Sequence, residues 1–145
     1  MKKFKLTKNS KVVNGITLHQ IQALKDFSNV KKGDLGGWIE KEKNLSQENS
    51  AWVSENALVY GDAWVSGNAR ISGDTQVYGD TWVYGDAWVS GNARVYDNAQ
   101  VYGDAEVYGD AWVYGNAEVY GDAKVYGDAK VSDTLVYGDE RNGLH

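Results

Sequence analysis

Two histidines are the residues of this 145-residue chain best suited to acid–base or metal chemistry, because an imidazole titrates near neutral pH and binds metal ions. His19 and His145 stand near opposite ends of the sequence, and the chain contains no cysteine. A lone histidine in a strand-like segment, such as His19, is interpreted as a structural or surface residue. We therefore expect no catalytic residue, no metal site and no cofactor.

Carboxylates recur at a fixed interval, since Asp86, Asp104 and Asp122 lie 18 residues apart. Carboxylates bind calcium, but the calcium-binding roll uses a nine-residue Gly-Gly-x-Gly-x-Asp unit that this sequence lacks. Two interpretations stay open. Corner geometry alone favours Asp and Asn, whereas a row of carboxylates could imitate the phosphates of a duplex and fit the basic groove of a nucleic-acid-binding protein.

Tryptophan and tyrosine residues recur at the same interval. One group is Trp64, Trp82, Tyr84, Tyr102 and Tyr120, and the other is Tyr60, Tyr78, Tyr96 and Tyr114. Stacked rings stabilise neighbouring segments by about 0.2–1 kcal/mol for each pair. Outward-facing rings in this number also make a larger apolar surface than a soluble monomer normally exposes, and Trp and Tyr dominate protein interfaces. We expect both groups to be contact surfaces.

A six-residue unit, Ala-x-Val-Tyr/Ser-Gly-Asp/Asn, positions all these side chains and repeats from Ala51 to Asp139. Residues two apart share a face of an extended segment, so Ala and Val point inward while the residues beside them point outward. Gly followed by Asp or Asn suits a corner. One short strand cannot bury its apolar face alone, so the units must stack as coils of a solenoid.

This pattern resembles the hexapeptide-repeat family, in which a small residue follows an aliphatic one after four positions, as from Val59 to Ala63. The resemblance implies an all-β fold: a single-stranded, left-handed parallel β-helix of triangular section with about 18 residues per coil. Acyltransferases of this family place a histidine on or beside the coils, and its carbonic anhydrases hold a metal with three. No histidine lies in the repeats of this chain, so neither set of residues carries over.

The chain divides into an N-terminal basic cap (1–44), a β-helix of hexapeptide repeats (45–139) and a short polar tail (140–145). We expect the cap to be β-rich, with a hairpin at Asn14-Gly15, whereas residues 19–30 suit either a helical turn or a bulged strand. An open solenoid end must be covered. Leu35, Trp38 and Ile39 are the predicted plug. The spacing between Val131 and Val136 slips to five, so the coils are expected to end with that unit.

The segment Gly33–Glu40, followed by Asn44-Leu45-Ser46, resembles the opening of small hexapeptide-repeat proteins of phages and prophages. The resemblance suggests a phage origin.

Charge is distributed unevenly along the chain. Residues 1–44 hold ten Lys and four acidic residues, a balance of +6, and the remaining residues hold five basic and sixteen acidic ones, a balance of −11, which together give the net charge of −5. Lysines without arginine are a weak footprint for nucleic acid, so direct binding is not expected. The lack of cysteine, of a secretory signal and of a membrane-length apolar run favours the cytoplasm.

These patterns predict a non-enzymatic binding or assembly protein that forms a homo-oligomer, with a trimer favoured. One alternative is an inhibitor of a host defence or DNA-processing protein that acts through the acidic surface. Another is an enzyme of the acyltransferase type.

Overall fold

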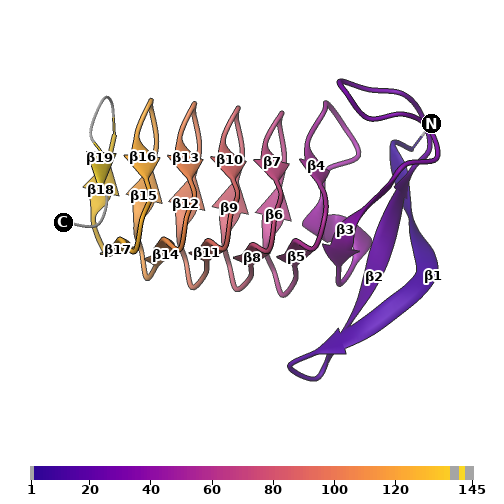
Figure 1. The fold of residues 1–145 in the computed structure, drawn as a ribbon, viewed down its shortest axis with the longest axis horizontal. Helices are drawn as coiled ribbons and strands as arrows, with labels where there is room; N and C mark the ends of the chain where they lie inside the picture. The colour runs from indigo at the N-terminus through magenta and orange to yellow at the C-terminus, as the bar shows by residue number, and fades with distance from the viewer. Residues whose placement is uncertain (1, 138–140, 143–145) are drawn as a thin grey trace.

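Three sheets wound from one chain form the protein in the computed structural model, which describes residues 2–137 and 141–142. The coils stack in a row, and a β1–β2 hairpin at the N-terminal end projects past their side (Figure 1). Glu42–Asn44 form a single turn of 3-10 helix, η1, and the other described elements are strands. No described helix has the length and apolar character needed to cross a bilayer. The predicted all-β parallel β-helix is confirmed.

Each coil contributes one short strand to each of three sheets. Sheet 1 holds, in order, β1 (Phe4–Val13), β2 (Ile16–Ala23), β3 (Leu35–Ile39), β5 (Leu58–Val59), β8 (Gln76–Val77), β11 (Arg94–Val95), β14 (Trp112–Tyr114) and β17 (Lys130–Ser132). Sheet 2 holds β4 (Trp52–Val53), β7 (Arg70–Ile71), β10 (Trp88–Val89), β13 (Glu106–Val107), β16 (Lys124–Val125) and β19 (Arg141–Asn142). Sheet 3 holds β6 (Trp64–Val65), β9 (Trp82–Val83), β12 (Gln100–Val101), β15 (Glu118–Val119) and β18 (Leu135–Val136).

Parallel pairing brings residues 18 apart side by side through the regular coils. Trp88, for example, pairs with Arg70 on one side and with Glu106 on the other. The Val and Ile side chains of the repeat are buried, and most are fully so. The inner Ala and Thr positions are buried as well, except for Ala129, which is half-buried at the C-terminal end. The columns that the sequence predicted are therefore the columns of the structure.

Corners between strands depend on left-handed backbone. Gly85 has a φ of +69°, and a Cβ added there would lie 2.8 Å from the backbone nitrogen of Gly103 on the next coil. Both the dihedral angle and the close approach of neighbouring coils exclude a side chain at this position. Asp97 takes a glycine position with a φ of 65°, and its Oδ2 accepts a hydrogen bond from the Gly115 N–H at 3.1 Å.

The C-terminal coil tolerates the shortened spacing. Val119 pairs with Val136, 17 residues later, so β18 stays in sheet 3 despite the missing corner residue. β19 then pairs with β16. Coiling thus continues beyond the predicted end of the repeats, and part of the predicted polar tail is a strand. His145 lies outside the described residues.

The cap is the expected β-rich segment, and its hairpin turns at Asn14 and Gly15, both with positive φ. Its first strand runs from Phe4 to Val13. The segment whose conformation the sequence left open continues as strand β2 as far as Ala23. It then forms a turn that the backbone groups of Phe27 and Val30 close with hydrogen bonds.

Strand β3 joins the cap to the solenoid, because it is antiparallel to β2 and parallel to β5. Its two glycines lie against the first coil. A Cβ at Gly36 would meet the carbonyl oxygen of Val53 at 2.5 Å, and one at Gly37 would meet the Cγ1 of Val53 at 2.7 Å. The glycine-rich segment before Trp38 therefore has a packing role.

The predicted plug of the open end is only partly correct. Ile39 is fully buried and Trp38 is half-buried, but Leu35 is 53% exposed, because Gly36 and Gly37 rather than Leu35 lie against the first coil. Phe4 and Ile21 fill the end instead.

Polar groups complete the closure of this end. The Lys3 Nζ is buried and donates a hydrogen bond to the Ala51 carbonyl oxygen at 2.6 Å. Burial, with a smaller contribution from Lys25, lowers the pKa of Lys3 to about 8. Gln47, at an aliphatic position of the repeat pattern, accepts hydrogen bonds from the backbone N–H groups of Lys3 and Phe4.

Candidate interaction surface

Two exposed tryptophans begin the aromatic file on sheet 3. The repeat places Trp64 and Trp82 in the outward position of β6 and β9, where they are 41% and 46% exposed. Their ring centroids lie 5.6 Å apart with an interplanar angle of 88°, an edge-to-face contact. Neighbouring coils therefore stabilise each other here while leaving a large part of each ring in solvent.

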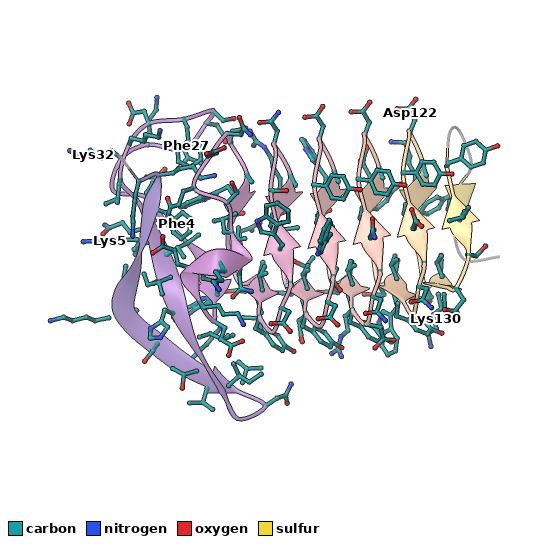
Figure 2. All side chains as sticks on the ribbon, turned by 180° about the vertical axis from the view of Figure 1, so that it is seen from behind. Phe4, Lys5, Phe27, Lys32, Asp122 and Lys130 are labelled. Atoms are coloured by element: carbon teal, nitrogen blue, oxygen red, sulfur yellow. The ribbon has the colours of Figure 1, made fainter. Side chains whose placement is uncertain are left out.

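Tyrosines continue this file along the coils. Tyr84, Tyr102 and Tyr120 stack at centroid distances of 4.8 and 5.1 Å, and Tyr137 stacks on Tyr120 at 5.4 Å. Figure 2 shows rings standing in rows along the coils. Sheet 3 thus brings together its predicted group of five aromatic residues.

Sequence reasoning missed two members at the far end. Leu135 and Tyr137 are 56% and 55% exposed, and the shortened spacing before β18 disguised their position. The signal was the aliphatic residue Val136, which places Leu135 and Tyr137 in the two outward positions. We call the whole set the sheet 3 aromatic surface: Trp64, Trp82, Tyr84, Tyr102, Tyr120, Leu135 and Tyr137.

The tyrosines of this surface are held in their neutral form. The Tyr102 hydroxyl donates to Glu118 Oε1 at 2.8 Å. Burial, together with this hydrogen bond and the charge of Glu118, raises the pKa of Tyr102 to about 12. Burial and the same carboxylate also raise the pKa of Tyr84. At neutral pH these two rings present uncharged hydroxyls.

The second predicted aromatic group is only partly accessible. Tyr60, Tyr78, Tyr96 and Tyr114 stack on sheet 1 at centroid distances of 5.0 to 5.2 Å. Tyr60, however, is 5% exposed, because it packs in a cluster with Leu18 of the β1–β2 hairpin and Leu58. The expectation that Tyr60 faces solvent is wrong, since sequence periodicity contains no information about where the hairpin lies.

The acidic column also forms as predicted, at the corners that follow sheet 3. Asp86, Asp104 and Asp122 are exposed, and Figure 2 shows Asp122 at a corner of the coils. Loss of hydration, followed by the charges of Asp122 and Asp86, raises the pKa of Asp104. The described residues contain no group of His, Cys, Asp and Glu side chains arranged to hold a metal ion.

His19 lies in β2 and pairs with Ser10 and Ile39 in the antiparallel cap. It is half-buried, and its imidazole makes no hydrogen bond to the described part of the chain. No acid–base pair is built around it there.

Comparison with known proteins agrees with the coil geometry. Residues 63–79, 87–103 and 99–115 match the model of the YdcK beta solenoid repeat. The repeats are β-solenoid repeats of the hexapeptide type. A relative named "Uncharacterized acetyltransferase YdcK", from Escherichia coli (strain K12), is 33% identical over 70 residues. The match covers 42% of this chain and 22% of that protein, so it spans about a fifth of the relative's length.

Proposed function

We propose that this protein is a non-enzymatic binding and assembly module of the cytoplasm that self-associates through the sheet 3 aromatic surface. The observation that supports the proposal is the exposure of Trp64, Trp82, Leu135 and Tyr137, each at least 41% accessible, on one file of short parallel strands. Apolar side chains exposed in a continuous file mark interaction sites, and Trp and Tyr contribute most to interface energies.

The other two sheets favour sheet 3 as the contact. The hairpin already covers the start of the tyrosine file on sheet 1. On sheet 2, Glu106 and Lys124 form an ion pair at 2.6 Å in the corresponding outward column. Rods that associate side by side through one face can close as a symmetric ring. A trimer with parallel coil axes is the expected assembly.

Light scattering after size-exclusion chromatography tests the assembly. Wild-type protein is expected to elute as an oligomer, and the double variant Trp64→Ser, Trp82→Ser as a monomer with unchanged circular dichroism. Trp88→Ser is the matched control, because Trp88 is 52% exposed but lies on sheet 2. A wild-type monomer, or equal loss of assembly in the control, would contradict the proposal.

The acidic column supports a second candidate, inhibition of a basic nucleic-acid-processing protein in a bacterium that a phage infects. Stacked, exposed carboxylates concentrate negative potential along one edge of the rod. The triple variant Asp86→Asn, Asp104→Asn, Asp122→Asn is expected to lose a partner captured from a host lysate at low salt. Capture that survives both high salt and the triple variant argues against this candidate.

The name of the Escherichia coli relative supports a third candidate, acyl transfer. Calorimetric titration with acetyl-CoA tests it. Saturable binding that His19→Ala weakens would favour an enzyme over a binding module.

A further inference from the structure

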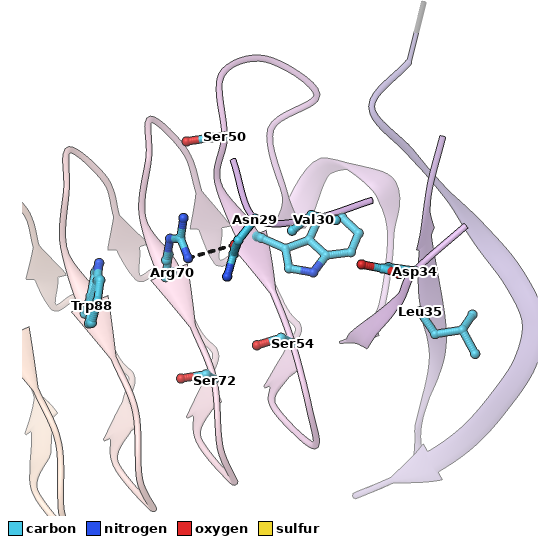
Figure 3. A pocket seen from close by; sticks show the side chains of 10 residues that line it. Asn29, Val30, Asp34, Leu35, Ser50, Ser54, Arg70, Ser72 and Trp88 are labelled. Carbon is cyan, nitrogen blue, oxygen red and sulfur yellow. Dashed lines mark hydrogen bonds between the residues drawn. The ribbon is translucent and has the colours of Figure 1, made fainter. Parts of the chain in front are cut away.

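A pocket of about 380 Å³ lies between the cap and sheet 2 (Figure 3). The cap contributes Asn29 and Asp34 to one wall, and strands β4, β7 and β10 contribute the other. The indole of Trp52 lines the pocket and is 7% exposed. Its ring is fixed from behind by edge contacts with Phe27 at 5.3 Å and Phe4 at 6.5 Å. The pocket is therefore preformed.

Arg70 supplies the positive charge of this pocket. Its Nη1 donates to Asn29 Oδ1 at 3.0 Å, and its Nη2 donates to the Ser28 hydroxyl. No carboxylate lies within ion-pair distance of Arg70 in the described part of the chain, in contrast to the Glu106–Lys124 pair farther along the same sheet. Two neutral acceptors thus orient the guanidinium, which keeps its charge and further N–H donors for a ligand.

Trp88 lies on the next coil in register with Arg70 and is 52% exposed. It lines the pocket together with the hydroxyls of Ser54 and Ser72. The indole offers a flat apolar face, and the hydroxyls both donate and accept hydrogen bonds. A cation, a flat ring and several hydroxyls in one small pocket suit a polar ring compound that carries an acid group.

Asp34 limits the charge of that ligand. Its Oδ2 accepts a hydrogen bond from the Lys31 N–H at 2.9 Å, and a carboxylate accepts several more. Because Asp34 offsets the charge of Arg70, the pocket disfavours a doubly charged phosphate and favours a monoanion that also has hydroxyl groups to donate. The volume lies at the small end of the roughly 300–1,000 Å³ range of ligand pockets, which suits a ligand of one ring.

We propose that this pocket binds a hexuronic acid unit. Arg70 holds the carboxylate, Asp34 and the serine hydroxyls bind the sugar hydroxyls, and the C–H face of the sugar packs on Trp88. The pocket is separate from the sheet 3 aromatic surface, so this proposal does not depend on self-association.

Isothermal titration of the full-length protein with sodium D-glucuronate and sodium D-galacturonate tests the proposal. Saturable binding of at least one uronate is expected, about tenfold or more tighter than that of D-glucose, because a charge-assisted hydrogen bond distinguishes them. Arg70→Gln should abolish the difference between uronate and glucose. Trp88→Ala should weaken the binding of both sugars about threefold to tenfold.

Arg94→Gln is the matched control, because Arg94 occupies the same outward position on sheet 1 and lies outside this pocket. The control should bind the uronates as the wild type does. The absence of saturable binding of both uronates, equal affinity for glucose, tighter binding of glucose 6-phosphate, or equal weakening in Arg70→Gln and Arg94→Gln would each overturn the proposal.

Discussion

Two inward threonines show how much one hydroxyl matters at the residue scale. Both Thr75 and Thr81 replace the inner Ala of the repeat and are fully buried, as the sequence predicted. The Thr81 hydroxyl donates to the Tyr78 carbonyl oxygen at 2.6 Å, whereas the Thr75 hydroxyl has no hydrogen-bond partner. An unpaired buried polar group costs about 1–3 kcal/mol.

We therefore expect Thr75→Val to raise the free energy of unfolding by about 1 kcal/mol, because valine fills similar space without the unpaired hydroxyl. Thr81→Val should give no such gain, since it removes a satisfied hydrogen bond. Chemical denaturation of both variants measures the difference. Equal effects in the two variants would contradict the role assigned to the Thr75 hydroxyl.

Tyr102 predicts how stability responds to alkaline pH. Its folded-state pKa of about 12 lies above the ordinary value of 10.0, so the folded chain keeps a proton that the unfolded chain loses first. The stabilisation is complete below pH 10 and is lost as the pH rises through about 12. Tyr102→Phe should therefore reduce the fall in unfolding free energy between these values, measured by denaturation at a series of pH values. An unchanged pH profile would show that Tyr102 does not contribute.

Residue types alone concealed the closure of the N-terminal end. Lys3 is one of ten lysines in a basic segment, where a solvated side chain is the ordinary expectation, yet its ammonium group binds the Ala51 carbonyl oxygen. Asn44 is likewise buried and donates to the carbonyl oxygens of Gly61 and Ala63. These contacts join residues far apart in the sequence, and no local pattern predicts them.

Corner glycines carry the strongest constraint at the scale of the element. We expect Gly85→Ala to destabilise the protein by about 2 kcal/mol or more, because alanine disfavours a positive φ and its Cβ would meet the backbone of Gly103. Gly15→Ala is the control, since Gly15 also has a positive φ but nothing lies within 4 Å of its added Cβ. Its cost should be about 1 kcal/mol. Thermal or chemical unfolding separates the two, and equal costs would contradict the packing argument.

Repeat period alone predicted the strands, their columns and the sheet 3 aromatic surface, because each rung pairs with a copy of itself. Two features escaped it at this scale. The strand β19 follows a shortened spacing that suggested an end to the coils. The pocket beside Arg70 needs a loop of the cap to come near sheet 2, and Asn29 lies 41 residues before Arg70 in the sequence.

At the scale of the whole molecule, the cap decides which faces remain accessible. The β1–β2 hairpin covers Tyr60 on sheet 1, and the loop around Asn29 forms a wall over sheet 2. Sheet 3 keeps its tryptophans exposed close to the cap, beginning with Trp64 on its first strand. One small segment thus assigns three different roles to three chemically similar faces.

The 18-residue register between coils makes the surface of this rod depend on phase. Removing residues 87–104 subtracts a full turn and should leave every downstream side chain on its own face. Removing only residues 93–98 subtracts a third of a turn, so all later strands would rotate to a neighbouring face while the valine interior stays intact. Circular dichroism should then report the same backbone, whereas assembly through sheet 3 should survive the first deletion and fail in the second. A change of length that leaves the fold unchanged would therefore rewrite what the molecule presents to a partner.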